Sequence, residues 1–170
     1  MRPRFLGHTW CFRMTAVLLG CFLGTSFAAS LRPQRSRTAV EEILAIHQAD
    51  RRAHFAGDAT MLIEHSAPEI LSVKDGKITR QSRDDIRKQF EEYFRGSKYS
   101  AWDDLEPPQV RVSDDGRMAW MVVRVHSKFF RTLDGGKEER NEFVSAWTST
   151  YEKPEGKWLM TSVTSTFEPK

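Results

Sequence analysis

The first half of the chain repeats its hydrophobic residues with the period of a helix. Thr38 and Glu41 have the spacing of a capping box, which predicts a helix start at Thr38. Gly57 predicts its end near Ala56. Between these signals one side of a helical wheel carries Val40, Ile43, Leu44, His47, Arg51, His54 and Phe55. The pattern predicts an amphipathic helix over residues 38–56.

Two further helices and a hairpin follow. Asp58 is a capping residue for a short helix that runs through Glu64 and stops before Pro68. Ser82 opens a third helix, which Gly96 ends, and its apolar stripe consists of Ile86, Phe90 and Phe94. Between these helices, residues 70–73 and 77–79 flank the turn Lys74-Asp75-Gly76 and predict a β-hairpin.

The second half alternates hydrophobic and polar residues with the period of a strand. Strands are predicted at residues 110–112, 118–131, 143–151 and 158–167, with Gly-containing turns between them. Within 118–131 one face carries Ala119, Met121, Val123, Val125 and Phe129, and the other carries Trp120, Val122, Arg124, His126 and Lys128. The order predicts an α+β domain in which three N-terminal helices pack on one side of a curved antiparallel sheet.

Residues 1–28 have the order of a signal peptide. Arg2, Arg4 and Arg13 precede the apolar stretch 14–27, and small residues at Ser26 and Ala28 suit cleavage after Ala28. Residues 29–37 are then a flexible lead into a domain over 38–168, in a secreted or periplasmic protein. The alternative is a lipoprotein, because Leu18-Leu-Gly-Cys21 resembles a lipidation motif that would tether the chain to a membrane.

Composition narrows the chemistry of the mature chain. The 170 residues contain 26 basic and 23 acidic side chains, and the surplus of three lies within the first 28 residues. The remaining residues are therefore neutral overall, which argues against nucleic acid as a partner. Both cysteines, Cys11 and Cys21, precede the predicted cleavage site, so disulfides and thiolate sites are not expected. No apolar run is long enough for a membrane span.

The chain resembles the nuclear transport factor 2-like superfamily, which includes SnoaL-like and ketosteroid isomerase-like proteins. The resemblance rests on the order of several segments: the helix end 53–58, the short helix 60–64, the Asp75-Gly76 hairpin, the helix 83–94 and Gly156-Lys-Trp158 before the last strand. It implies a cone-shaped domain with a pocket between the helices and the concave sheet. It also implies a homodimer formed through the sheet.

Two departures from these relatives bear on function. Many relatives carry His at alternate positions of the last strand, pointing into the pocket, where this chain has Ser162 and Thr164. The ketosteroid isomerase pattern also needs a carboxylate base, and the inward positions of residues 118–131 are apolar. Steroid isomerisation is therefore not expected, since a fold does not by itself establish chemistry.

Candidate functional residues lie mainly on the first helix. His47 and Asp50 are the candidate proton carriers, and Arg51 and His54 the candidate ligand contacts beside them. Further candidate ligand contacts come from the strands and the segment before them, namely Trp102, Met121, Trp147, Ser162 and Thr164. The alternative for the helix residues is a hydrogen-bonded rim. No metal site or cofactor is predicted, because two His at this spacing lack a third ligand.

Three functions compete on this pattern. The first is a pocket that binds a small, partly apolar molecule without chemistry, which the sparse polar positions favour. The second is an isomerase, cyclase or hydratase that uses acid–base residues of the first helix. The third is an assembly domain, similar to the association domain of calcium/calmodulin-dependent kinase. The half-apolar outer face with Trp120 and Arg124 favours a homodimer.

Overall fold

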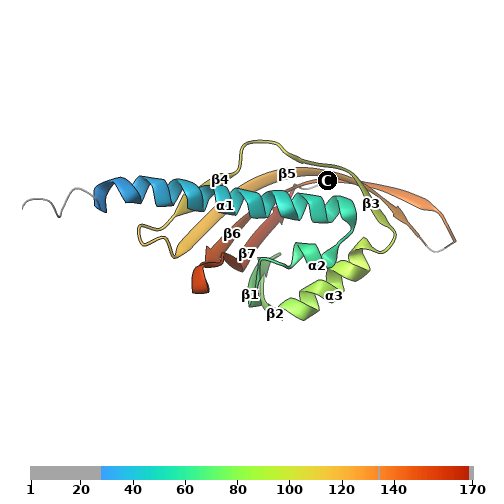
Figure 1. The fold of residues 1–170 in the computed structure, drawn as a ribbon. Helices are drawn as coiled ribbons and strands as arrows, with labels where there is room; N and C mark the ends of the chain where they lie inside the picture. Colours follow the sequence, from blue (N-terminus) through green and yellow to red (C-terminus); the bar gives the residue numbers. More distant parts are fainter. Residues whose placement is uncertain (1–27, 134, 169–170) are drawn as a thin grey trace, which may run out of the picture.

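The fold combines three helices with one curved, seven-stranded sheet (Figure 1). It is described by a computed structural model for residues 28–133 and 135–168, with the backbone alone for 28–36. The helices are α1 (Ala28–Ala56), α2 (Ala59–Leu62) and α3 (Arg83–Phe94), and a 3-10 turn spans Pro154–Gly156. The strands are β1 (Ser66–Lys74), β2 (Lys77–Ser82), β3 (Ser97–Asp104), β4 (Gln109–Val112), β5 (Met118–Thr132), β6 (Glu138–Glu152) and β7 (Leu159–Phe167).

The sheet is mixed rather than wholly antiparallel, which corrects the prediction. Its strand order is β2-β1-β7-β6-β5-β3, and β4 pairs with the part of β5 that β3 leaves free. All neighbours are antiparallel except β1 and β7. The last strand lies between β1 and β6, so by running antiparallel to β6 it runs parallel to β1. The α+β class of the prediction is confirmed.

Two of the three predicted helix caps and the predicted hairpin are present. The Asp58 carboxylate accepts a hydrogen bond from the Met61 amide at 2.9 Å, and Ser82 Oγ accepts one from the Asp85 amide at 3.1 Å. The β1–β2 hairpin pairs Lys74 with Lys77 around the predicted turn. Both caps and the hairpin are thereby confirmed. They fix the path of the chain from α1 to α3, since each cap satisfies an amide that the helix cannot.

The start of α1 differs from the prediction. The helix begins at Ala28, so Thr38 lies within it instead of capping it. The stretch 28–37 contains Ala, Leu, Gln and Arg, which are good helix formers, and the helix continues through it although Pro33 has no amide hydrogen to donate. The proposed signal peptide and Cys21 lie almost entirely outside the described residues, so cleavage and lipidation stay predictions. Within the described part of the chain, no helix has the length and apolar character of a membrane span.

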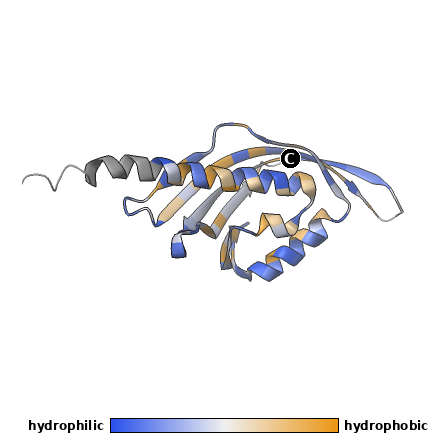
Figure 2. Ribbon diagram, in the orientation of Figure 1, coloured by the Kyte–Doolittle hydropathy of each residue, from blue (hydrophilic) through white to orange (hydrophobic). Residues whose placement is uncertain are grey.

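The core lies between α1 and the concave face of the sheet. Along β5 the predicted inward residues are all buried, and Met121 and Val125 have no exposed surface. Ile43 of α1 is also fully buried within the same cluster. Figure 1 shows α1 running across the sheet, while Figure 2 shows hydrophobic and hydrophilic residues mixed along this helix. Apolar and polar residues alternate along β5, so its apolar residues form the inner face of the sheet against which α1 packs.

Strand β3 was not predicted, and a bulge explains why. The acidic, proline-containing segment 102–108 indicates an edge strand without giving the bounds of β3, and Ser97–Asp104 pairs with β5 at the edge of the sheet. The register shifts between Tyr99 and Ala101, so the buried residues Tyr99 and Trp102 are three positions apart. A bulge of this kind breaks the alternation on which strand prediction depends.

Candidate functional site

One face of α1 directs polar side chains against the sheet. His47 is fully buried, and Asp50, one turn later, is half-buried. The buried residues Ile43, Ile46 and Ala53 lie before and after them on the helix. Residues three and four apart share a helix face, so packing of the apolar residues carries the polar ones inward with them.

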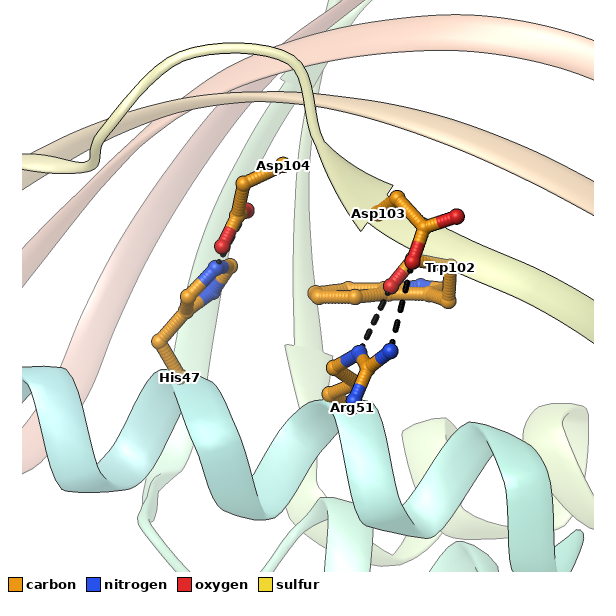
Figure 3. Close-up of polar contacts among 5 residues, drawn as sticks. All are labelled: His47, Arg51, Trp102, Asp103 and Asp104. Carbon is orange, nitrogen blue, oxygen red and sulfur yellow. Dashed lines mark hydrogen bonds and ion pairs between the residues drawn. The ribbon is translucent and has the colours of Figure 1, made fainter.

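His47 is held by a carboxylate of the edge strand. Its Nε2 lies 2.7 Å from Oδ1 of Asp104, which is the last residue of β3 (Figure 3). The imidazole also packs against two indoles, with ring centroids 5.1 Å from Trp102 and 6.2 Å from Trp147. The ring is therefore fixed in position by one polar contact and two aromatic contacts.

Arg51 ties the same two elements together at the surface. Its Nε donates to the backbone carbonyl of Trp102 at 2.8 Å, and Nη2 contacts the Asp103 carboxylate at 3.2 Å (Figure 3). Both side chains of this ion pair are largely exposed, so solvent screens it. Arg51 thus lies at the rim, as the alternative interpretation held, and its ligand-binding role stays a prediction.

His54 forms part of an aromatic cluster. Its Nδ1 donates to the backbone carbonyl of Asp50 at 2.7 Å. The ring meets Phe94 and Tyr99 edge-on, with centroids 5.5 and 5.2 Å away, and lies 5.3 Å from Trp102. Burial lowers the pKa of His54, and the nearby His47 adds to this. The neutral ring fits a packing role better than anion binding.

The carboxyl of Asp50 has the most strongly shifted pKa among the acids of the site. Burial raises the pKa of its carboxyl from 3.8 to about 8, and no other described group contributes to the shift. A neighbouring cation or a hydrogen bond to the ionised form would oppose such a shift. At neutral pH most molecules therefore hold Asp50 protonated, and a minority hold it as carboxylate. A carboxyl that changes state in this range can give or take a proton.

Strand β6 contributes two groups that the sequence analysis did not single out, beside the predicted Trp147. Trp147, Ser149 and Tyr151 alternate along its inward face, and Ser149 pairs directly with Met121 of β5. Burial raises the pKa of the Tyr151 hydroxyl and the charge of Asp50 raises it further, while the neighbouring Ser149 hydroxyl opposes this shift. Asp50 and Tyr151 are thus electrostatic neighbours across the interface between α1 and the sheet. The alternation from Trp147 onward was the signal that could have identified Ser149 and Tyr151.

Two buried polar atoms of this region have no hydrogen-bond partner among the described residues. They are Nδ1 of His47 and Oγ of Ser149, whose hydroxyl is close enough to Tyr151 to lower the pKa of the phenol. Buried polar groups in native proteins are nearly always paired with protein, water or ligand. Trp147, two residues before Ser149 on the same face, touches the ring of His47. Both atoms therefore lie in the region where α1 faces β6.

Ser162 and Thr164 do not face this region, which corrects their prediction as inward residues. They pair with Thr150 and Thr148 on β6, which point away from the concave face. Ser162 Oγ lies 2.6 Å from the Thr150 hydroxyl on that outer side. The register shifts by one residue just before Ser162, so the alternation counted from Trp158 fails beyond the bulge.

The other predicted contacts line the interface as packed residues. Trp102 is almost fully buried, Met121 is completely buried, and both belong to the core cluster. Trp147 is half-buried and packs 5.9 Å from Trp102 between ring centroids. Among residues 28–133 and 135–168, no group of three or more His, Asp or Glu side chains has an arrangement that could hold a metal ion.

Comparison with solved structures shows a shared fold. An NTF2-like protein with a cystatin-like fold from Novosphingobium aromaticivorans superposes with a TM-score of 0.57 and 23% identity, over 88% of this chain and 92% of its own. A ketosteroid isomerase-like protein from Erwinia carotovora atroseptica gives a TM-score of 0.59 at 14% identity, over 76% of this chain and 96% of its own.

An assembly domain has the same fold. The association domain of CaMKII from C. elegans superposes with a TM-score of 0.54 and 13% identity, covering 77% of this chain and 97% of its own. No protein-family model and no curated protein matches the sequence. At these identities the neighbours establish the architecture and leave the chemistry to the residues of this chain.

The buried carboxyl predicts a particular pH dependence of stability. The folded state keeps the Asp50 proton up to about pH 8, whereas an unfolded Asp loses it near 3.8. The folded state is therefore penalised progressively as pH rises from about 4 to 8. Replacing Asp50 by Asn should remove this penalty and raise the free energy of unfolding at pH 8 by on the order of a few kcal/mol. Urea unfolding at pH 5 and pH 8 measures the difference.

The matched control for this measurement is Asp75→Asn. Asp75 is exposed in the β1–β2 turn, at a positive φ that Asn tolerates. Its substitution should leave the pH dependence unchanged. A gain from Asp50→Asn that is the same at both pH values would contradict a buried, protonated Asp50.

Proposed function

We propose that this protein, which has the fold of the NTF2-like superfamily, binds a small, partly apolar molecule between α1 and the concave face of the sheet. We further infer that Asp50 exchanges a proton with that molecule in an isomerase- or dehydratase-type reaction. The observation that carries the proposal is the carboxyl of Asp50, which burial alone poises to titrate near pH 8.

The surroundings of Asp50 suit a ligand of mixed character. Trp102 and Trp147 supply aromatic surface, and Met121 supplies apolar surface beside Ser149. Polar atoms are few, and they sit on both sides of the interface. Small-molecule sites commonly combine an apolar lining with a few placed polar groups.

The proton chemistry follows from the ionisation of Asp50. Its carboxylate form removes a proton from a carbon next to a carbonyl, and its protonated form returns that proton to another carbon or to a leaving hydroxyl. The hydroxyls of Ser149 and Tyr151 are the nearby donors available to a carbonyl oxygen on which charge develops. Binding without chemistry, the other function predicted from the sequence, shares the same site and lacks only the proton transfer.

An exchange experiment separates the two. In D₂O, NMR should show deuterium entering β,γ-unsaturated cyclic ketones next to the carbonyl in the presence of the protein. Asp50→Asn should slow this exchange by about 100-fold or more, and Asp75→Asn should leave it unchanged. The rate should rise with pH and level off above about pH 8, because the carboxylate is the active form. Binding of the ketones without catalysed exchange would show a binding protein instead.

The outer face of the sheet supports a second proposal, a homodimer. Trp120 and Val122 of β5 are exposed there, and the neighbouring outward residues of β6, Thr148 and Thr150, are short. An exposed Trp on a half-apolar surface is typical of a protein contact. The association domain of CaMKII, which shares this fold, shows that the architecture occurs in a domain used for association.

Substitution of the outer face tests the dimer. Trp120→Glu should convert a dimer into a monomer in light scattering after size exclusion, since a buried unpaired charge strongly opposes association. Lys88→Glu on the exposed side of α3 is the control and should leave the mass unchanged. A wild-type monomer at high protein concentration would refute the dimer.

Export is proposed from the N-terminal sequence alone. The basic and apolar order of residues 1–28 supports a secreted or periplasmic location. Mass spectrometry of the protein recovered from the extracellular or periplasmic fraction should find a chain that starts at Ala29. A lipid-modified chain that starts at Cys21 would support the membrane-tethered alternative, and an uncleaved cytoplasmic chain would contradict both.

A further inference from the structure

The ionisable ring of His47 is locked in one orientation. Nε2 faces Asp104 at 2.7 Å, and the indoles of Trp102 and Trp147 pack against the ring. The side chain of His47 has no exposed surface, while that of Asp104 keeps about a fifth of its own. Solvent can therefore reach the carboxylate of Asp104. It cannot reach the imidazole of His47, so water does not compete for the hydrogen bonds of the ring.

This contact selects the tautomer of the neutral ring. A carboxylate only accepts hydrogen bonds, so Nε2 must carry the proton that it donates to Asp104. The other nitrogen, Nδ1, then has a bare lone pair. The neutral ring thus presents an acceptor on the side away from Asp104.

That acceptor is unused within the described part of the chain. Nδ1 of His47 is buried and has no partner there. His54, two turns along the same helix, has the opposite tautomer, because its Nδ1 carries the proton and donates it to the carbonyl of the residue four positions earlier. His47 does not make the equivalent bond. The imidazole of His47 points its Nε2 toward Asp104, and in this orientation Nδ1 has no partner among the described residues.

The other polar groups of the region can act as hydrogen-bond donors, in contrast to the acceptor Nδ1 of His47. Ser149 Oγ is also buried and lacks a partner among the described residues, and a hydroxyl donates readily to a carbonyl oxygen. The Asp50 carboxyl, on the turn after His47, donates as well when it is protonated. One position therefore accepts a hydrogen bond from a ligand, and others donate to it.

On the basis of the proposed function, we propose that the ligand is a small hydroxy-carbonyl compound whose hydroxyl donates to His47 Nδ1 and whose carbonyl oxygen is bound near Ser149 and Asp50. Asp104 is a positioning residue that selects the accepting tautomer. His47 is the residue that determines specificity for the hydroxyl.

Three cyclic ketones of similar size test the assignment. 4-Hydroxycyclohexanone offers a donor at the second oxygen, cyclohexane-1,4-dione offers only an acceptor, and cyclohexanone has no second oxygen. Titration followed by protein NMR should show the hydroxyketone binding wild-type protein on the order of tenfold more tightly than either of the others, because the wrong partner leaves Nδ1 unpaired.

Variants assign the preference to the proposed atoms. His47→Phe removes the acceptor while keeping a ring of similar size, and it should abolish the preference. Asp104→Asn should weaken or invert it, since an amide that donates to the imidazole favours the opposite tautomer. Nitrogen-15 NMR of labelled histidine reads the tautomer directly. Asp103→Asn is the matched control, because Asp103 contacts Arg51 and leaves His47 untouched.

The possible outcomes distinguish the hydroxyl site from the function on which it rests. Equal binding of the three ketones with Asp50-dependent deuterium exchange would overturn the hydroxyl site alone, and would mean that a bound water satisfies Nδ1. A preference retained in His47→Phe would also overturn the hydroxyl site. Failure of all three ketones to bind or exchange would overturn both proposals. Preference for the hydroxyketone that is lost in His47→Phe and kept in Asp103→Asn supports the assignment.

Discussion

The removal of polar groups of α1 from water is the constraint on which the rest of the structure depends. The helix packs on an apolar sheet face, and its inward stripe contains His47 and Asp50 as well as Ile43 and Ala53. Burying an ionised group without a partner costs far more than burying an apolar one. Each buried polar group must therefore be stabilised by its own surroundings, and this happens in different ways for different groups.

His47 and Asp50 show two such solutions one turn apart. The imidazole obtains a carboxylate partner, because β3 ends with Asp104 beside it. The Asp50 carboxyl has no compensating charge among the described residues, and it remains protonated over the neutral range instead. One group is stabilised by pairing and the other by a changed protonation state. The arrangement leaves two buried polar atoms, His47 Nδ1 and Ser149 Oγ, without a hydrogen-bond partner among the described residues. Apolar side chains could fill this interface without leaving such atoms unpaired.

Local signals in the sequence were sufficient for much of this architecture, and bulges account for two of the differences, the missed strand β3 and the inward set of β7. Caps at Asp58 and Ser82 and the alternation of β5 depend on neighbouring residues only, so they could be predicted. The inward set of β7 depends on a register shift near Thr161, which moves Ser162 and Thr164 to the outer face. A one-residue shift reverses every later side chain, and it carries no clear signal in composition. The parallel pairing of β1 and β7 is likewise set by long-range sheet order.

The residues of the candidate site also differ in how far the sequence alone could identify them. His47 and Asp50 could be identified because helical spacing fixes which residues share a face. Their partners could not, because Asp104 and Tyr151 reach them from strands that are distant in the sequence. The sheet supplies apolar surface, hydroxyls and the carboxylate of Asp104, and the helix supplies the candidate proton carriers His47 and Asp50. Proteins with 13–23% identity to this chain share its fold, and a shared fold does not by itself establish chemistry. The chemistry of this chain therefore has to be inferred from the α1 face and from the strand atoms that it meets.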